Sequence, residues 1–456
     1  MDIGLISVLL LVGIVVLLGI GMPLGFASGF LAVAVLFMKF GPDLLLDTFG
    51  RGPLNILAAR MYGLTTDYVI ISVPLFIFMA SLLERSGIAR DMFNSLNVWL
   101  SRTRGGIAIV TSVMAIIMAA MSGIIGGEIV LLGLIALPHM LRLGYNQNLA
   151  IGTICASGSL GTMIPPSIVL IIYGLITETS IHALFKAAFL PGFVLGGLYI
   201  LYIIVRTRLH PEQAPLPETG NEVTMGDKIR ALPGLLPPLL IVFVVLGSIY
   251  GGITGITEAA GMGCVAVLVL ILIRGELDWS LFKDAMMRTF KSTGTILWIT
   301  FGATALAGAY TIAGGPTYVA NLIVGAELPT MGILLVMMLI FLFLGAIMDW
   351  VGIVLLVMPV FLPIIARLPA EELGLTGALG AAPAFVSVWF GILFCVNMQV
   401  SFLSPPFGPA AFYLKSVAPP HISLPAIFRG FMPFIVIQLC MLMAILLFPE
   451  ITMVFR

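Results

Sequence analysis

Two diproline interruptions, in corresponding apolar segments of the two halves, constrain this chain more than any other feature. Pro165-Pro166 and Pro405-Pro406 each break an apolar run, and a Tyr follows each pair at the same interval. Upstream of each pair, a lone acid lies ten residues before a proline: Glu128 in the first half and Asp349 in the second. Paired interruptions in corresponding halves of an apolar chain are typical of the binding site of a secondary transporter.

Composition places the chain in a lipid bilayer. The 456 residues are 60% hydrophobic and only 9% charged. A soluble fold of this size could not keep so much apolar surface away from water. Apolar runs of about 20 residues recur along the whole chain, which is the length that a membrane-spanning helix needs. We therefore expect an all-α membrane protein, and because the net charge is zero we expect no nucleic-acid partner.

Four apolar segments differ from simple spans. Segments 106–141 and 329–366 each consist of two arms that are a little short for a full crossing, joined at small or polar residues. They are predicted to be re-entrant helical hairpins, which are tolerated when protein or a water-filled cavity surrounds them. Segments 148–178 and 384–418 are too long for one helix. Each is predicted to split at its diproline, because proline removes a backbone donor and clashes with the preceding turn.

The order of these segments predicts two inverted repeats. Residues 1–205 contain five predicted crossings plus one hairpin, and residues 233–456 contain five more plus the second hairpin. An odd number of crossings in each half inverts the second copy relative to the first. Residues 206–232 form the predicted hydrophilic linker, expected on the cytoplasmic side. Amphipathic connectors at 39–67 and 274–292 are predicted interfacial helices, the latter followed by a separate span at 293–312.

The distribution of basic residues orients this layout. With both termini outside, Lys and Arg at the inner loops and span ends outnumber those at the outer ones. Such an excess marks the cytoplasmic side. The first hairpin is then expected to open from the cytoplasm and the second from the outside.

The interruptions are also where we expect the chemistry. Unwound carbonyls and the C-terminal ends of half-helices suit Na⁺, a hard cation that takes oxygen ligands, whereas half-helix N-termini suit carboxylates. The predicted Na⁺ residues are Ser122, Gly123, Gly161, Ile164, Gly345, Asp349, Met398 and Ser404. The predicted substrate-binding residues are Glu128, Thr162, Pro165, Pro166, Ser167, Ser401, Pro405 and Pro406.

The sequence indicates a functional role more strongly for Asp349 than for Glu128. Asp349 is the strongest single candidate, because an acid in the middle of an apolar hairpin is costly and therefore indicates function. Its alternative role is a helix cap. For Glu128, a functional and a structural role are equally compatible with the sequence. No nucleotide-binding, serine-hydrolase or zinc-protease motif occurs in the chain, so we expect neither direct ATP drive nor an enzyme.

Several motifs together resemble one family along nearly the whole chain. They include Val73-Pro74-Leu75-Phe76, Ala119-Ala120-Met121-Ser122-Gly123, Gly161-Thr162-Met163-Ile164-Pro165-Pro166-Ser167 and Ser404-Pro405-Pro406-Phe407-Gly408. In these the chain is similar to the large membrane subunit of TRAP (tripartite ATP-independent periplasmic) transporters, the DctM type. The resemblance implies a Na⁺-driven importer of small organic anions, typically carboxylates, in the bacterial inner membrane. It also implies an elevator mechanism, a small DctQ-type membrane subunit and a soluble periplasmic binding protein.

The chain departs from the family at the first hairpin. Ile124 and Ile125 follow Ser122-Gly123 where many members have two more serines, and Glu128 stands where a Thr or another small residue is common. A tip with few hydroxyls implies an altered ligand set or a different substrate. The alternative to a tripartite importer is a stand-alone Na⁺- or H⁺-coupled organic-anion transporter of similar inverted architecture.

Overall fold

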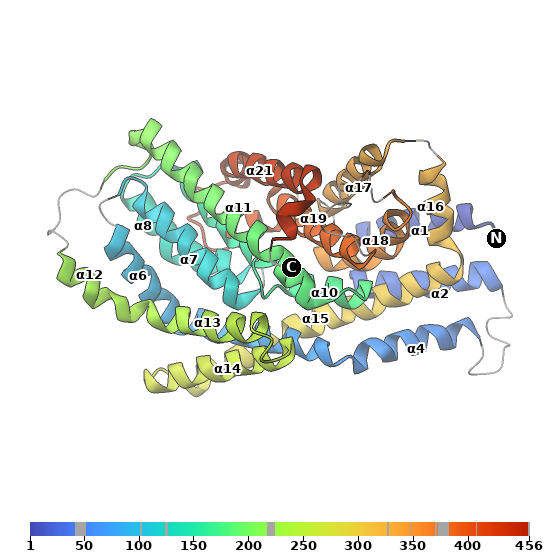
Figure 1. The fold of residues 1–456 in the computed structure, drawn as a ribbon, viewed down its shortest axis with the longest axis horizontal. Helices are drawn as coiled ribbons and strands as arrows, with labels where there is room; N and C mark the ends of the chain where they lie inside the picture. Colours follow the sequence, from blue (N-terminus) through green and yellow to red (C-terminus); the bar gives the residue numbers. More distant parts are fainter. Residues whose placement is uncertain are drawn as a thin grey trace.

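The computed structural model describes residues 1–41, 52–100, 103–123, 126–216, 224–325, 328–346, 348–369, 372, 383–406 and 408–454. Throughout these ranges the regular elements are helices, and none of the residues forms a β-strand. The helices pack into an elongated bundle (Figure 1). The prediction of an all-α protein is confirmed for the described part of the chain.

The first half contains ten α-helices and two short 3₁₀ helices within its described ranges. Their bounds are α1 Ile3–Gly19, α2 Leu24–Phe40, α4 Pro53–Thr66, η1 Tyr68–Ile71, α5 Ser72–Arg85, α6 Ile88–Leu100, α7 Gly106–Ser122, α8 Gly127–Arg142, α9 Gln147–Gly158, η2 Leu160–Thr162, α10 Ile168–Thr177 and α11 Ile181–Leu209. The predicted hairpin at 106–141 is thus the pair α7 and α8, and the predicted broken segment at 148–178 is α9, η2 and α10.

The linker and second half follow a related order. The helices are α12 Met225–Ala231, α13 Leu236–Tyr250, α14 Ile256–Ile273, α15 Trp279–Ile312, α16 Gly315–Val324, α17 Thr330–Gly345, α18 Trp350–Ile365, α19 Pro383–Leu403, α20 Pro409–Lys415 and α21 Leu424–Leu447. The segment predicted as a hairpin at 329–366 is the pair α17 and α18. The segment predicted as broken at 384–418 is the pair α19 and α20.

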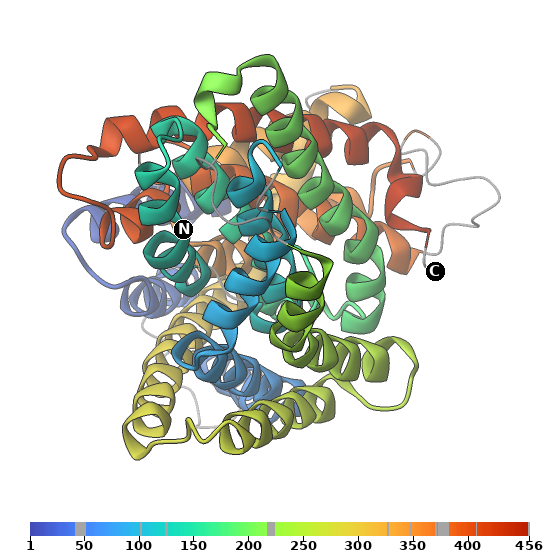
Figure 2. The ribbon, with the colours of Figure 1, turned by 90° about the vertical axis from the view of Figure 1, so that its left-hand side faces the viewer.

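Six described helices are long and apolar enough to cross a membrane, or seven if the bent pair formed by α12 and α13 counts as one. The six helices are η1 with α5, then α11, α14, α15, α19 and α21. Several of these elements leave apolar side chains exposed: Ile273 of α14 is 76% exposed, and Phe243 of α13, in the bent pair, is 74% exposed. Figure 2 shows α13 and α14 at one edge of the bundle. Apolar faces exposed in this way suit contact with lipid rather than water.

Helix α19 is enclosed by the protein. The protein buries 89% of its apolar span, against 39% for α14 and α15. Two of its polar side chains bond to neighbouring helices: the Trp389 indole donates to the Ile445 carbonyl oxygen at 3.0 Å, and the Asn397 amide donates to the Met338 carbonyl oxygen at 2.9 Å. Buried polar groups need such partners, and here they also fix α19 against α17 and α21. The buried Gln399 amide has no partner among the described residues.

The longest helix, α15, differs from the prediction. The sequence predicted an interfacial helix at 274–292 and a separate span at 293–312, whereas α15 runs without interruption from Trp279 to Ile312. In its first half, Asp284 and Arg288 form ion pairs with α5, while Lys291 is exposed. Helix α15 packs against α2, α4, α5 and α18. In Figure 1, α2, α4 and α15 lie side by side along the lower part of the bundle.

Candidate functional site

In the first half, the hairpin tip lies against the diproline break. Gly123 ends α7 in the left-handed conformation with φ +62°, which favours glycine. Its carbonyl oxygen accepts a hydrogen bond from the Ile168 amide at 3.2 Å. A Cβ at Gly123 would overlap the carbonyl oxygen of Pro166. Glycine is therefore needed here both for the turn and for the close approach of the break.

The polar residues of the break mostly bond within it. Ser167 donates to the Thr162 carbonyl oxygen at 2.5 Å and caps α10, where its hydroxyl accepts from the Leu170 amide at 3.4 Å. Gly161 lies in η2, which packs against α7. The Pro165–Pro166 bond is cis, and both prolines are buried.

Glu128 begins the second arm of this hairpin and is wholly buried. Its Oε1 accepts a hydrogen bond from the Ser122 hydroxyl. Its Oε2 has no partner among the described residues. Buried carboxyl oxygens are normally bonded, so Oε2 lacks the partner that such an atom usually has.

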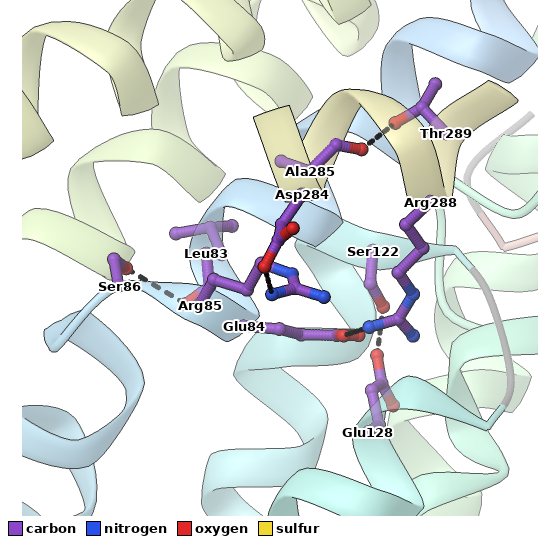
Figure 3. Close-up of polar contacts among 10 residues, drawn as sticks. All are labelled: Leu83, Glu84, Arg85, Ser86, Ser122, Glu128, Asp284, Ala285, Arg288 and Thr289. Atoms are coloured by element: carbon purple, nitrogen blue, oxygen red, sulfur yellow. Dashed lines mark hydrogen bonds and ion pairs between the residues drawn. The ribbon is translucent and has the colours of Figure 1, made fainter. Parts of the chain in front are cut away.

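An ion pair lies beside this carboxyl (Figure 3). The Arg288 guanidinium of α15 pairs with the Glu84 carboxylate of α5. A Cβ at Gly127 would overlap both groups, so the pair rests directly on the hairpin. One turn away, Arg85 pairs with Asp284 at 2.7 Å. These pairs join α5 to α15 where both helices meet the tip.

In the second half, the hairpin tip meets the broken helix α19. A Cβ at Gly345 would overlap the hydroxyl of Ser401, and Met398 lies next to it. A small cavity of about 10 Å³ lies between them, lined by Gly345, Met348, Asp349, Trp350, Met398, Ser401, Phe402 and Pro409. That volume is about what a single water molecule or ion requires. The structure thus brings together four of the residues predicted to bind Na⁺ or substrate: Gly345, Asp349, Met398 and Ser401.

A larger cavity, which we call the central cavity, joins the two halves. Its volume is about 320 Å³, and it is lined by Gly123, Thr162, Ile168, Val169, Lys291, Ser292, Thr295, Ile296, Asp349, Trp350, Val351, Phe402 and Tyr413. Both hairpins and both broken helices contribute to it, together with α15. Asp349 lines the small cavity as well as the central one. It is the residue before α18, and its side chain forms no capping hydrogen bond.

Several predicted residues lie elsewhere. Ile164 faces α11, where its side chain approaches Gly192. Ser404 donates to the Val400 carbonyl oxygen at 2.7 Å, and Pro405 and Pro406, joined by a cis bond, are exposed. Neither the second diproline pair nor Glu128 lines the central cavity. The two diproline corners are therefore not equivalent in their surroundings.

Helix α15 lines part of this cavity, a contribution that the sequence did not predict. Lys291, Ser292 and Thr295 were assigned to a surface connector and the span after it, although polar residues at this spacing share one helix face. For Tyr413, the sequence indicates only its interval after Pro406. It lines the cavity, whereas its counterpart Tyr173 is buried and donates to the Ser387 carbonyl oxygen at 2.7 Å.

Comparison with known proteins identifies the family. Residues 11–451 match the family model of the tripartite ATP-independent periplasmic transporter, DctM component. The chain belongs to this family. It is accordingly a multi-pass membrane protein of a transporter family, whose named members are permeases and not enzymes.

Two relatives illustrate the range of this family. The chain is 28% identical to the C4-dicarboxylate TRAP transporter large permease protein DctM of Pseudomonas aeruginosa, covering 93% of this chain and 92% of the relative. It is 26% identical to the sialic acid TRAP transporter large permease protein SiaM of Vibrio cholerae, covering 96% and 95%. The substrates in the names of these relatives differ from one another, so family membership leaves the substrate of this chain open.

The fold is also shared with a solved structure. The YdaH transporter of Alcanivorax borkumensis superposes with a TM-score of 0.59 at 16% identity, covering 93% of this chain and 96% of that one. This likeness concerns the fold alone.

Proposed function

We propose that this chain is the large permease subunit of a sodium-driven, binding-protein-dependent importer of small organic anions. The observation that carries the proposal is the central cavity, where both hairpin tips and both broken helices meet around Asp349. Irregular backbone at membrane depth is tolerated where it lines a cavity, and such places are the binding sites of secondary transporters.

Two positions suit sodium. In the second half, the small cavity between Gly345 and Ser401 is bounded by the Asp349 carboxylate and by the C-terminal end of α17. In the first half, the free carboxyl oxygen of Glu128 lies beside Ser122 at the end of α7. Carboxylate and hydroxyl oxygens at helix C-termini are suitable ligands for a hard cation. We therefore assign Glu128 to the ion and not to the substrate.

The organic anion is assigned to the central cavity. The N-termini of α10 and α18 border it at Ile168 and Trp350, and helix N-termini favour negative charge. Its volume is within the range of small-molecule sites.

The order of helices supports the inverted repeats, 1–205 and 233–456 around the linker 206–232. A helix of membrane-spanning length, a shorter helix, a hairpin, a broken helix and another spanning helix follow one another from η1 with α5 to α11, and again from α15 to α21. We place both termini in the periplasm and the linker in the cytoplasm of a bacterium, because basic residues are more numerous on the linker side.

A second cavity supports an elevator movement. It has a volume of about 660 Å³ and is bounded by later turns of α10, α15 and α18, the same helices that border the central cavity, together with α4. Along α15, Thr304 of this cavity lies nine residues beyond Thr295 of the central one, or about 14 Å. A slide of the hairpins and broken helices along α15 would move the site from one cavity to the other.

The family description is tripartite, so we propose two partners: a small membrane subunit of the DctQ type and a soluble periplasmic binding protein. The exposed apolar faces of the bundle provide the surface for the first partner and for lipid. The binding protein would deliver the anion to the cavity.

The proposal is tested by exchanging Asp349 for Asn. We expect Asp349→Asn to abolish sodium-dependent uptake in proteoliposomes that contain all three components, while the protein stays folded, because the amide removes the charge that holds the ion. Asp278→Asn is the matched control, since Asp278 precedes α15 in the same way, without a side-chain cap. Full sodium-responsive uptake by the Asp349→Asn variant would refute the assignment. Uptake by this chain without a binding protein would favour the stand-alone alternative.

A further inference from the structure

One positive charge in the central cavity has no partner. Two charged side chains line the cavity within the described residues, Lys291 and Asp349. The Lys291 ammonium forms no hydrogen bond or ion pair with any residue that the structure describes. The neighbouring basic residues are already paired, Arg288 with Glu84 and Arg85 with Asp284. Lys291 is therefore the cation that remains available to a ligand.

Polar residues around Lys291 line one wall of the central cavity, and apolar residues line its other walls. Ser292 and Thr295 lie on the same face of α15 and line the cavity with it. Thr295 donates its hydroxyl proton to the Lys291 carbonyl oxygen at 2.9 Å, so its oxygen remains free to accept. Apolar side chains of the broken helices line the other walls, among them Val169 and Phe402.

The charged residues that line the central cavity indicate the net charge of its ligand. In the proposed function, on which this inference rests, Asp349 is neutralised by sodium. Lys291 then leaves one net positive charge in a cavity with apolar walls. Lys291 is exposed, so water solvates its charge in the empty cavity, and one negative charge on the ligand gives it a partner by direct charge attraction. A second negative charge would have no partner among the described side chains that line the cavity.

We propose that Lys291 binds the charged end of the substrate, and that the substrate is a small monoanion. Its charged group is a carboxylate or sulfonate, whose oxygens accept hydrogen bonds from the Lys291 ammonium and the Ser292 hydroxyl. The rest of the molecule is uncharged and packs on the apolar walls. A lysine is a compact point charge with three donors, which suits a single oxyanion group without demanding the planar two-point geometry of arginine.

The test measures binding to the purified full chain in nanodiscs at saturating sodium by titration calorimetry. The probes are pyruvate, isethionate and succinate, which represent a monocarboxylate, a sulfonate and a dicarboxylate. We expect at least one of the monoanions to bind more tightly than succinate. Lys291→Gln should weaken that binding roughly 10- to 100-fold, the size expected for loss of a charge-assisted hydrogen bond. Lys291→Arg should recover part of it, and Lys283→Gln on the same helix should bind as the unchanged chain does.

Sodium binding without any anion is measured on the same samples. It serves as a check of folding, and we expect it to be equal in the Lys291→Gln variant and the unchanged chain. The inference is overturned if Lys291→Gln binds the monoanions as tightly as before, if succinate binds best, or if the unchanged chain binds sodium but no probe. Failure of the unchanged chain to bind sodium would instead overturn the proposed function.

Discussion

Replacing Gly123 with Ala tests how closely the first hairpin tip and the diproline break fit together. The substitution places a methyl group on a backbone with φ +62°, which costs an L-residue about 1–2 kcal/mol. The new Cβ also overlaps the Pro166 carbonyl oxygen and lies 3.3 Å from the Ile168 amide nitrogen. Both are backbone atoms of a buried corner, so relief requires moving the break itself, an overpacking cost of about 1–3 kcal/mol. Together, the two terms predict that the free energy of unfolding falls by roughly 2–5 kcal/mol.

The assay is chemical unfolding of the purified chain in nanodiscs, compared with Gly197→Ala. Gly197 lies inside α11, and a Cβ there meets no atom within 4 Å. Its replacement should stabilise the helix by about 0.5–1 kcal/mol, because alanine loses less conformational freedom than glycine. Equal unfolding of Gly123→Ala and Gly197→Ala would refute the packing argument. Normal sodium-dependent uptake by a destabilised Gly123→Ala protein would show that the corner is structural and not part of the site.

Two further predictions concern polar contacts between helices. The ion pair of Glu84 and Arg288 is intermediate between buried and exposed, with 9% and 38% of the side chains exposed. Glu84→Gln should therefore lower the free energy of unfolding by about 1–3 kcal/mol. A double-mutant cycle with Arg288→Gln should give a clear coupling energy, and strictly additive effects would contradict the ion pair. Tyr199→Phe removes the oxygen that accepts from the buried Gln438 amide at 2.9 Å. It should cost about 1–3 kcal/mol of unfolding free energy, and an unchanged unfolding midpoint would contradict that contact.

The sequence located the interruptions well, because the residues that end helices act locally. Ser122-Gly123 ends α7, and the diproline pairs separate α9 from α10 and α19 from α20. The chain was also expected to bring Asp349 near Gly345 and Ser401, and the small cavity does so. These are consequences of backbone chemistry within a few residues, which a single sequence displays.

The rest depends on contacts between distant segments. Lys283, Arg288 and Lys291 made the start of α15 look like a surface helix, but Arg288 is neutralised by Glu84, some two hundred residues earlier. Helix α16 was not predicted, because Gly314-Gly315-Pro316 resembles a loop, whereas Pro316 occupies the first turn of that helix. The sequence also did not predict that Pro405 and Pro406 are exposed while Pro165 and Pro166 are buried, because the burial of each pair depends on packing by distant segments.

The uninterrupted course of α15 limits how access to the cavity can change. Its 34 residues contain no proline and form a rod about 51 Å long, well beyond the ~30 Å thickness of the hydrocarbon layer. Sharp kinks in long helices arise at proline, at glycine–serine pairs or at bulges, and α15 lacks the first of these. In the proposed elevator movement, this continuous helix gives the solute a fixed edge to travel past. In that proposal, the four interrupted segments supply the motion.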